Sequence, residues 1–207
     1  MSIFDNLARP FPPDRVSWRV GPTNRDKTKG MALAYIDARD VMERLDAVCG
    51  PAGWQCRYPH ATGKTVCEIG LRVESEWIWK ADGAGDTDME AEKGALSDAF
   101  KRAAVRWGIG RYLYDLSSPW VLIEAFGKSY KIADAELPKL TFLLKAHFVA
   151  DCESHIRLAT DAAELRAWWL AGSAERRAFA LETTEATKLK DTAAARIAEL
   201  EPKKAAA

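Results

Sequence analysis

The stretch Asp98–Asp115, "DAFKRAAVRWGIGRYLYD", gathers basic and aromatic side chains within one predicted helix and the turn that follows it. Successive residues of a helix are rotated by about 100°, which places two groups of residues on opposite sides. One side carries charged residues: Asp98, Lys101, Arg102 and Arg106. The other side carries apolar residues: Leu96, Phe100, Ala103, Ala104 and Trp107. The stretch therefore predicts a helix with one packing face and one cationic face.

The cationic face has two interpretations. It can be an ordinary solvated surface, on which Asp98 and Arg102 form an i,i+4 pair. It can also bind single-stranded nucleic acid, which proteins hold with cations along the phosphates and aromatic rings against the bases. Further basic and aromatic residues nearby favour binding: Arg57, Arg72, Lys80, Arg111, Tyr112 and Tyr114. The composition alone leaves both interpretations open, and it does not assign Arg111, Tyr112 and Tyr114 to groove, core or subunit contact.

The overall charge of the chain indicates no particular partner. The 30 Lys and Arg residues balance the 30 Asp and Glu residues, so the chain of 207 residues has no net charge. Its length favours one domain, or one domain with a small appendage. Any prediction of a polyanionic partner must therefore rest on how the charges are arranged.

The cysteines and the apolar segments indicate a reduced intracellular protein, and we expect it in the cytoplasm. Four cysteines have apolar neighbours and form no C-x-x-C pair: Cys49, Cys56, Cys67 and Cys152. The first residues do not resemble a signal peptide, and no apolar run approaches the roughly 20 residues that span a bilayer. We expect no membrane partner.

The hydrophobic pattern predicts an α+β fold with an antiparallel β-meander packed on the long basic helix and a helical C-terminal tail. The predicted strands are residues 31–36, 54–58, 65–74 and 76–81. The predicted helices are 38–49, a basic helix that the Gly/Asp turn 82–93 runs into and that ends near Trp107, 137–158, a segment that begins at an Asp161/Glu164 capping pair, and 174–200. The predicted divisions are an N-terminal arm (1–23), a core (24–120), a helical extension (121–159) and a helical tail (160–207).

Two segments in this order resemble the Rad52 family of single-strand annealing proteins, particularly its bacterial and phage members. They are "YIDARDVMERLDAVCGPAGWQCRY" (35–58) and "EKGALSDAFKRAAVRWGIGRYLYDL" (92–116), separated by an alternating hairpin. The resemblance covers roughly residues 15–117. It implies oligomeric rings that bind single-stranded DNA in an outer basic groove and pair complementary strands without ATP, in homologous recombination and double-strand break repair.

The resemblance also implies a set of DNA-binding residues. Lys101 and Arg102 fall on the two DNA-contacting basic positions of the family's long helix, and Tyr35 falls on an aromatic residue of the same groove. Arg25 falls on a groove arginine. The family's next helix arginine falls on Val105, so that the nearest cation is Arg106, also about one turn from the pair. The remaining candidates, taken from the basic residues near this helix, are Arg57, Lys80 and Arg111.

Two other functions remain as alternatives to a non-enzymatic annealing protein without cofactor or metal. Asp86, Asp88, Glu90 and Glu92 could hold a metal ion of a DNA-processing nuclease, because hard cations bind several oxygen ligands. The same acids suit the first turn of a helix, where the dipole favours negative charge. Alternatively, residues 160–207 could recruit a single-strand-binding protein or a recombinase. No Walker A motif indicates ATP use.

Overall fold

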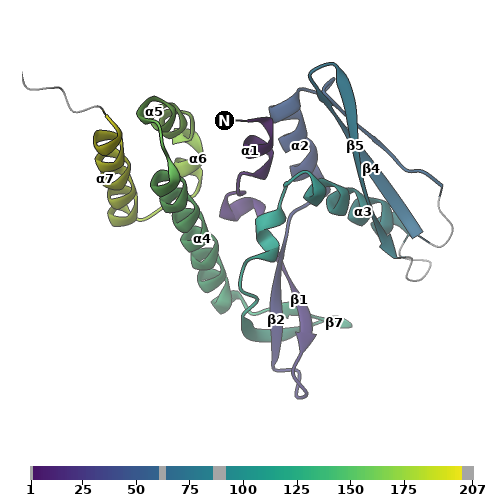
Figure 1. Cartoon of the computed structure of the whole chain (residues 1–207). Helices are drawn as coiled ribbons and strands as arrows, with labels where there is room; N and C mark the ends of the chain where they lie inside the picture. The colour runs from purple at the N-terminus through teal and green to yellow at the C-terminus, as the bar shows by residue number, and fades with distance from the viewer. Residues whose placement is uncertain (1, 61–63, 86–91, 202–207) are drawn as a thin grey trace, which may run out of the picture. The chain divides into compact units, whose positions relative to one another are not determined.

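The structure, a computed structural model, describes residues 2–60, 64–85 and 92–201 (Figure 1). The chain forms two compact units, Met1–Ala133 and Asp134–Ala207. The first unit therefore continues past residue 120, where the sequence pattern predicted the end of the core. Its last elements are two strands, in a segment that the pattern had assigned to a helical extension.

The first unit combines helices with two antiparallel sheets, as the α+β prediction required. Its strands are β1 (Ser17–Thr23), β2 (Lys29–Tyr35), β3 (Trp54–Arg57), β4 (Lys64–Val73), β5 (Glu76–Gly85), β6 (Trp120–Phe126) and β7 (Ser129–Ile132). Its helices are α1 (Ile3–Ala8), α2 (Ala38–Cys49) and α3 (Glu92–Arg106), with 3-10 turns η1 (Pro13–Arg15) and η2 (Arg111–Tyr114). The strand orders are β3-β4-β5 and β1-β2-β6-β7. The β3-β4-β5 meander confirms the predicted one.

The long helix α3 covers one face of the meander, as Figure 1 shows. Alternate residues of β4 are fully buried: Cys67, Ile69 and Leu71. Trp107, just after α3, is also buried, and its indole N–H donates to the Ile69 carbonyl at 3.0 Å. Leu96 was predicted on this packing face but is 47% exposed. This end of the face is only partly covered: Tyr58, whose hydroxyl donates to the Leu96 carbonyl, is also 42% exposed.

The N-terminal segment is attached to the rest of the unit rather than extended throughout. A capping box between Ser2 and Asp5 begins α1, and β1 pairs with β2. Arg44 of α2 donates to carbonyl groups of this segment and its guanidinium lies 4.2 Å from the centroid of the Phe11 ring. The hydroxyl of Tyr112 accepts from the Phe11 N–H at 3.0 Å. Tyr112 therefore anchors the N-terminal segment, a role that the sequence left open.

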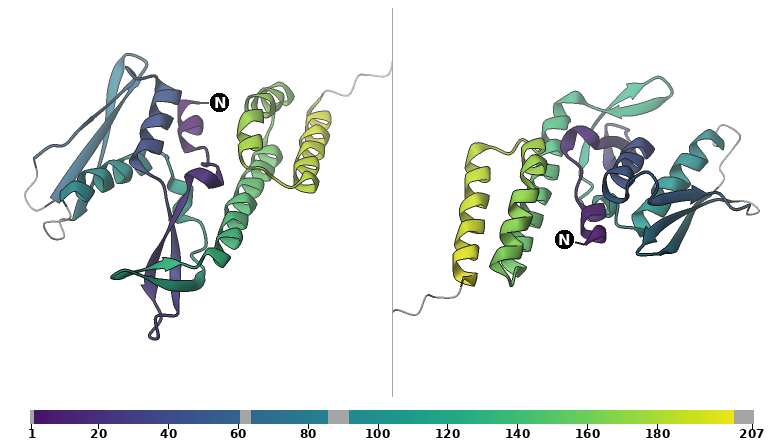
Figure 2. Two further views of the ribbon diagram at one scale, coloured as in Figure 1. Left: turned by 180° about the vertical axis from the view of Figure 1, so that it is seen from behind. Right: turned by 90° about the horizontal axis from the view of Figure 1, so that it is seen from above.

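The second unit is helical: η3 (Asp134–Glu136), α4 (Leu137–Leu158), α5 (Ala162–Ala171), α6 (Ser173–Ala178) and α7 (Thr183–Leu200). Figure 2 shows α4 and α7 side by side. The prediction for 137–158 is confirmed. The single helix predicted over 174–200 is wrong, because the chain turns between α6 and α7, where Ala180 has a φ of 46°. Phe179 stacks there on Phe148, with ring centroids 3.7 Å apart. The turn thus places the Phe179 ring in the core of this unit.

Candidate nucleic-acid interface

A groove of about 760 Å³ lies among α3, β2 and η2 in the first unit. We define it by the charged and aromatic residues that line it: Arg19, Tyr35, Asp98, Lys101, Arg102 and Tyr114. The strand β2 supplies Tyr35, and α3 supplies the two basic residues that the family resemblance assigned to DNA. The structure thus brings Tyr35, Lys101 and Arg102 into one groove.

Lys101 lies between an aromatic ring and a carboxylate. Its ammonium nitrogen lies 5.7 Å from the centroid of the Tyr35 ring, within the range of a cation–π interaction. The same nitrogen lies 3.0 Å from Asp98 Oδ1 in an i,i+3 ion pair. One quarter of the Lys101 side chain is exposed, against 61% for Asp98. Lys101 is therefore held in the groove with part of its side chain still exposed to solvent.

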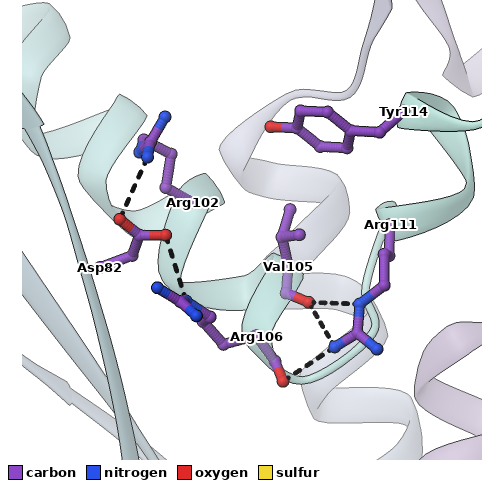
Figure 3. A pocket seen from close by; sticks show the side chains of 6 residues that line it. All are labelled: Asp82, Arg102, Val105, Arg106, Arg111 and Tyr114. Atoms are coloured by element: carbon purple, nitrogen blue, oxygen red, sulfur yellow. Dashed lines mark hydrogen bonds and ion pairs between the residues drawn. The ribbon is translucent and has the colours of Figure 1, made fainter.

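Arg102 and Arg106 share one carboxylate, that of Asp82 on β5 (Figure 3). Arg102 Nη2 lies 3.2 Å from Oδ1, and Arg106 Nε lies 3.3 Å from Oδ2. The Gly83 N–H donates to Oδ1 at 2.8 Å. Burial raises the pKa of Asp82, but the Gly83 N–H and the two guanidinium groups outweigh it and hold that pKa below its ordinary value. Asp82 of β5 therefore places a negative charge against the cationic face of α3.

A second, smaller cavity of about 380 Å³ adjoins the groove. Its lining, drawn in Figure 3, is Asp82, Arg102, Val105, Arg106, Arg111 and Tyr114. Three of these residues also line the groove: Arg102, Val105 and Tyr114. The family resemblance places an arginine where this chain has Val105, and Val105 lines both cavities. Arg106, the nearest cation, lines the smaller cavity. Tyr114, which the sequence left unassigned, is 71% exposed and borders both.

Arg111 caps the C-terminal end of α3. Its Nε and Nη2 donate to the Val105 carbonyl at 3.0 and 2.8 Å, and Nη2 also donates to the Arg106 carbonyl at 3.0 Å. A cation at this end satisfies carbonyl groups that have no helical partner and suits the helix dipole. Lys80 Nζ donates to the Arg106 carbonyl as well, at 3.1 Å. Both predicted DNA-binding residues thus stabilise the end of the helix.

The remaining predicted residues lie elsewhere in the first unit. Arg57 of β3 pairs with Glu68, and its guanidinium lies 4.1 Å from the centroid of the Trp79 ring. Lys80 lies 4.1 Å from the centroid of the Trp107 ring. Arg25 is exposed in the turn that joins β1 and β2. The structure does not bring Arg25, Arg57 and Lys80 into the lining of either cavity.

Sequence reasoning missed two charged residues of this interface. Arg19 lines the groove from β1 and pairs with Leu33 of β2, two residues before Tyr35. The prediction of an arm over this segment hid it, although Trp18 and Val20 around it suggest strand alternation. Asp82 falls within a predicted Gly/Asp turn. Nothing local in the sequence indicates that it meets Arg102 and Arg106, since the contact depends on how β5 packs against α3.

The acids of the alternative metal site are Asp86, Asp88, Glu90 and Glu92. The first three lie outside the described residues, and Glu92 begins α3. Among residues 2–60, 64–85 and 92–201, no group of three or more His, Cys, Asp or Glu residues is placed to hold a metal ion. Over the same part of the chain, no helix combines the length and hydropathy of a membrane span.

The fold and groove define an α+β protein with an antiparallel meander packed on a basic helix. Residues 2–69 and 60–130 match the sequence profile of the Rad52/22 family double-strand break repair protein. The chain belongs to this family, which confirms the resemblance.

Two bacterial proteins are similar to this chain. It is 38% identical over 135 residues to the single-stranded DNA-binding protein DdrA of Deinococcus deserti, a match that covers 64% of this chain and 66% of that protein. It is 42% identical over 116 residues to the single-stranded DNA-binding protein DdrA of Deinococcus radiodurans, covering 55% of each. The matched segments therefore span two thirds at most of either relative.

Proposed function

We propose that this protein binds single-stranded DNA in the groove and anneals complementary strands without ATP, in recombination and double-strand break repair. The observation that carries the proposal is the convergence of Lys101 and Arg102 with the rings of Tyr35 and Tyr114 on one cavity. Cations for phosphates beside flat rings for bases are the components of single-strand binding. Membership of the Rad52/22 family and the names of the two relatives support the same function.

The mechanism that follows from this groove is geometric and needs no catalytic residue. Lys101 and Arg102 neutralise the sugar–phosphate backbone, which carries no sequence information, so that binding is insensitive to sequence. A strand held by its phosphates keeps base edges accessible to a second strand. Neutralised phosphates release counterions, so affinity falls steeply with salt. Self-association into a ring would join the grooves of successive subunits. A protein without net charge would then present a long cationic path to DNA.

An annealing assay tests this proposal and separates it from the nuclease alternative. Two complementary labelled oligonucleotides are mixed with the protein in the absence of ATP, once with magnesium and once with a chelator. We expect faster duplex formation in both conditions, intact strands, and rings in electron micrographs of the same sample. Strand loss that the chelator abolishes would instead support a nuclease that uses the acids around Asp88.

The helical unit supports a second role, recruitment of a repair partner. The family match ends at residue 130, and the first compact unit ends at Ala133. Residues 134–207 thus form a separate unit outside the family match, which suits a part of the chain that contacts a single-strand-binding protein or recombinase. Removal of residues 134–207 should leave binding of single-stranded DNA intact and abolish co-purification of such a partner. Loss of DNA binding on removal would contradict this division of roles.

A further inference from the structure

The cationic face of α3 is paired with carboxylates of the same chain. Lys101 lies 3.0 Å from Asp98, and Arg102 and Arg106 lie 3.2 and 3.3 Å from Asp82. The two carboxylates differ in setting. Asp98 is 61% exposed, so water screens its pair with Lys101, whereas Asp82 is only 20% exposed. Asp82 is therefore the acid with the stronger effect on this face.

The position of Asp82 resembles that of a bound anion. Its two oxygens each accept from a different guanidinium group, one from Arg102 and one from Arg106. The Gly83 N–H holds the carboxylate through a third hydrogen bond, which anchors Asp82 to its own strand when the arginines turn toward a ligand. Both arginines are half exposed or more, at 51% and 60%. They are accessible to a phosphate while still bound to a carboxylate.

We infer that Asp82 is an internal competitor of the DNA phosphates for Arg102 and Arg106, and that it limits how tightly the protein holds a strand. The inference rests on the proposed function and deepens it. A phosphate that approaches these arginines meets a site already half neutralised, because one carboxylate serves two guanidinium groups. Weaker retention suits annealing, since a strand must leave the groove once it has formed a duplex.

Asp82→Asn tests the inference, because asparagine has nearly the same shape and its carbonyl oxygen can still accept from the Gly83 N–H. We expect its affinity for a labelled oligo-dT to rise about threefold to tenfold, as expected for removing one or two partly screened ion pairs. The slope of log K against log salt should steepen by about 0.7 for each additional phosphate that the released arginines neutralise. Dissociation should slow, measured by stopped-flow competition with unlabelled strand.

A matched control and a mutant cycle make the result specific. Glu76→Gln removes the same charge from an exposed position at the other end of β5 and should leave affinity within about twofold. In an Arg102→Ala, Arg106→Ala background, Asp82→Asn should no longer tighten binding, because the competing pairs are gone. Tightening that persists in this background would show a general charge effect and overturn the inference.

The outcomes also separate this inference from the proposed function. If Asp82→Asn binds as wild type does, Asp82 is not a competitor and the inference fails. If it binds more weakly, the inference also fails, and Asp82 instead positions the arginines. If wild-type protein itself fails to bind oligo-dT, the proposed function fails and this inference with it. Circular dichroism establishes that the variant is folded. Should asparagine not be tolerated, Asp82→Thr removes the charge with a residue that suits a strand, and the same rise in affinity is expected.

Discussion

The ammonium group of Lys101 on α3 lies 5.7 Å from the centroid of the Tyr35 ring on β2, within the groove. The contact links the two sheets of the first unit, because β2 belongs to one sheet and α3 covers the other. A DNA strand that contacts both residues would therefore touch β2 of one sheet and the helix that covers the other sheet. Substitutions of the groove residues should therefore affect DNA binding, and substitutions of buried residues away from the groove should affect folding.

Lys101→Ala combined with Arg102→Ala should weaken binding of oligo-dT by about tenfold or more at moderate salt, because two cations no longer neutralise phosphates. The slope of log K against log salt should become shallower by about 1.4, at about 0.7 for each phosphate. Fluorescence anisotropy across a salt series measures both. A matched double variant, Arg177→Ala with Lys190→Ala in the helical unit, should bind nearly as wild type does. Equal binding by the two double variants would place the strand elsewhere.

Tyr114→Ala should weaken binding by about 1–3 kcal/mol if its exposed ring stacks on a base. Tyr114→Phe keeps the ring and should bind as wild type does, which separates stacking from hydrogen bonding by the hydroxyl. Titrations with an abasic oligonucleotide complete the test, since without bases the alanine variant and wild type should bind alike. A loss on the abasic strand equal to that on oligo-dT would argue against stacking.

Arg111→Ala should lower mainly the stability of the protein, and Arg106→Ala should lower mainly its affinity for DNA. Loss of Arg111 removes the hydrogen bonds to the Val105 and Arg106 carbonyls and should cost about 1 kcal/mol of unfolding free energy. Loss of the exposed Arg106 should change stability by less than about 0.5 kcal/mol but should reduce DNA affinity. Thermal melts and anisotropy of both variants test this pair. An Arg111 variant with unchanged stability and weaker binding would instead make Arg111 a DNA contact.

Trp107→Phe should destabilise the first unit by about 2 kcal/mol, because it removes the hydrogen bond to the buried Ile69 carbonyl and leaves space in the core. Trp120→Phe provides the control, since Trp120 is 46% exposed and the same change there should cost less than about 0.5 kcal/mol. Urea denaturation followed by circular dichroism measures both. Equal destabilisation by the two changes would contradict the packing role of Trp107.

Stability should decline in alkali. Burial raises the pKa of the Cys67 thiol to about 11 and that of the Cys152 thiol to about 12, whereas unfolded thiols titrate near about 8.5. The unfolded chain therefore binds fewer protons above that pH. The stability contribution of these thiols is complete below about pH 8.5 and is lost as the pH rises toward their folded pKa values.

Urea denaturation at pH 7.5 and pH 10.5, with reductant present, measures this decline. Other groups contribute to it, so the comparison is with Cys152→Ala, which lacks one of the buried thiols. The loss of unfolding free energy between the two pH values should be smaller in the variant than in wild type. An equal loss would show that Cys152 does not contribute to the pH dependence.

Local patterns in the sequence were sufficient for the meander, for the longer helices of the first unit and α4, and for the basic residues of α3 that line the groove. Helical periodicity predicted α2, α3 and α4, and strand alternation predicted the meander. Of the predicted packing face of α3, Phe100 and Trp107 are buried as expected, but Leu96 is exposed. Of the second sheet only β2 was predicted, as the strand 31–36. Its other strands, β1, β6 and β7, were missed because the segments 1–23 and 121–159 were interpreted as an arm and a helical extension. The break between α6 and α7 was missed because Ala180, where the chain turns, is a residue that favours helix, and the stacking of Phe179 on Phe148 at this turn joins residues far apart in the sequence.

The sequence by itself determined the family and the cationic face, because both depend on residue order and on the helical repeat. Only the tertiary structure decided which charges share a surface. Packing brings Tyr35 to Lys101, gives Arg111 to the end of α3 and sets Asp82 between Arg102 and Arg106. Coulombic and hydrogen-bond energies depend on distances of a few ångströms between residues far apart in the chain. A sequence pattern shows that charges are present, but the fold determines which of them neutralise one another.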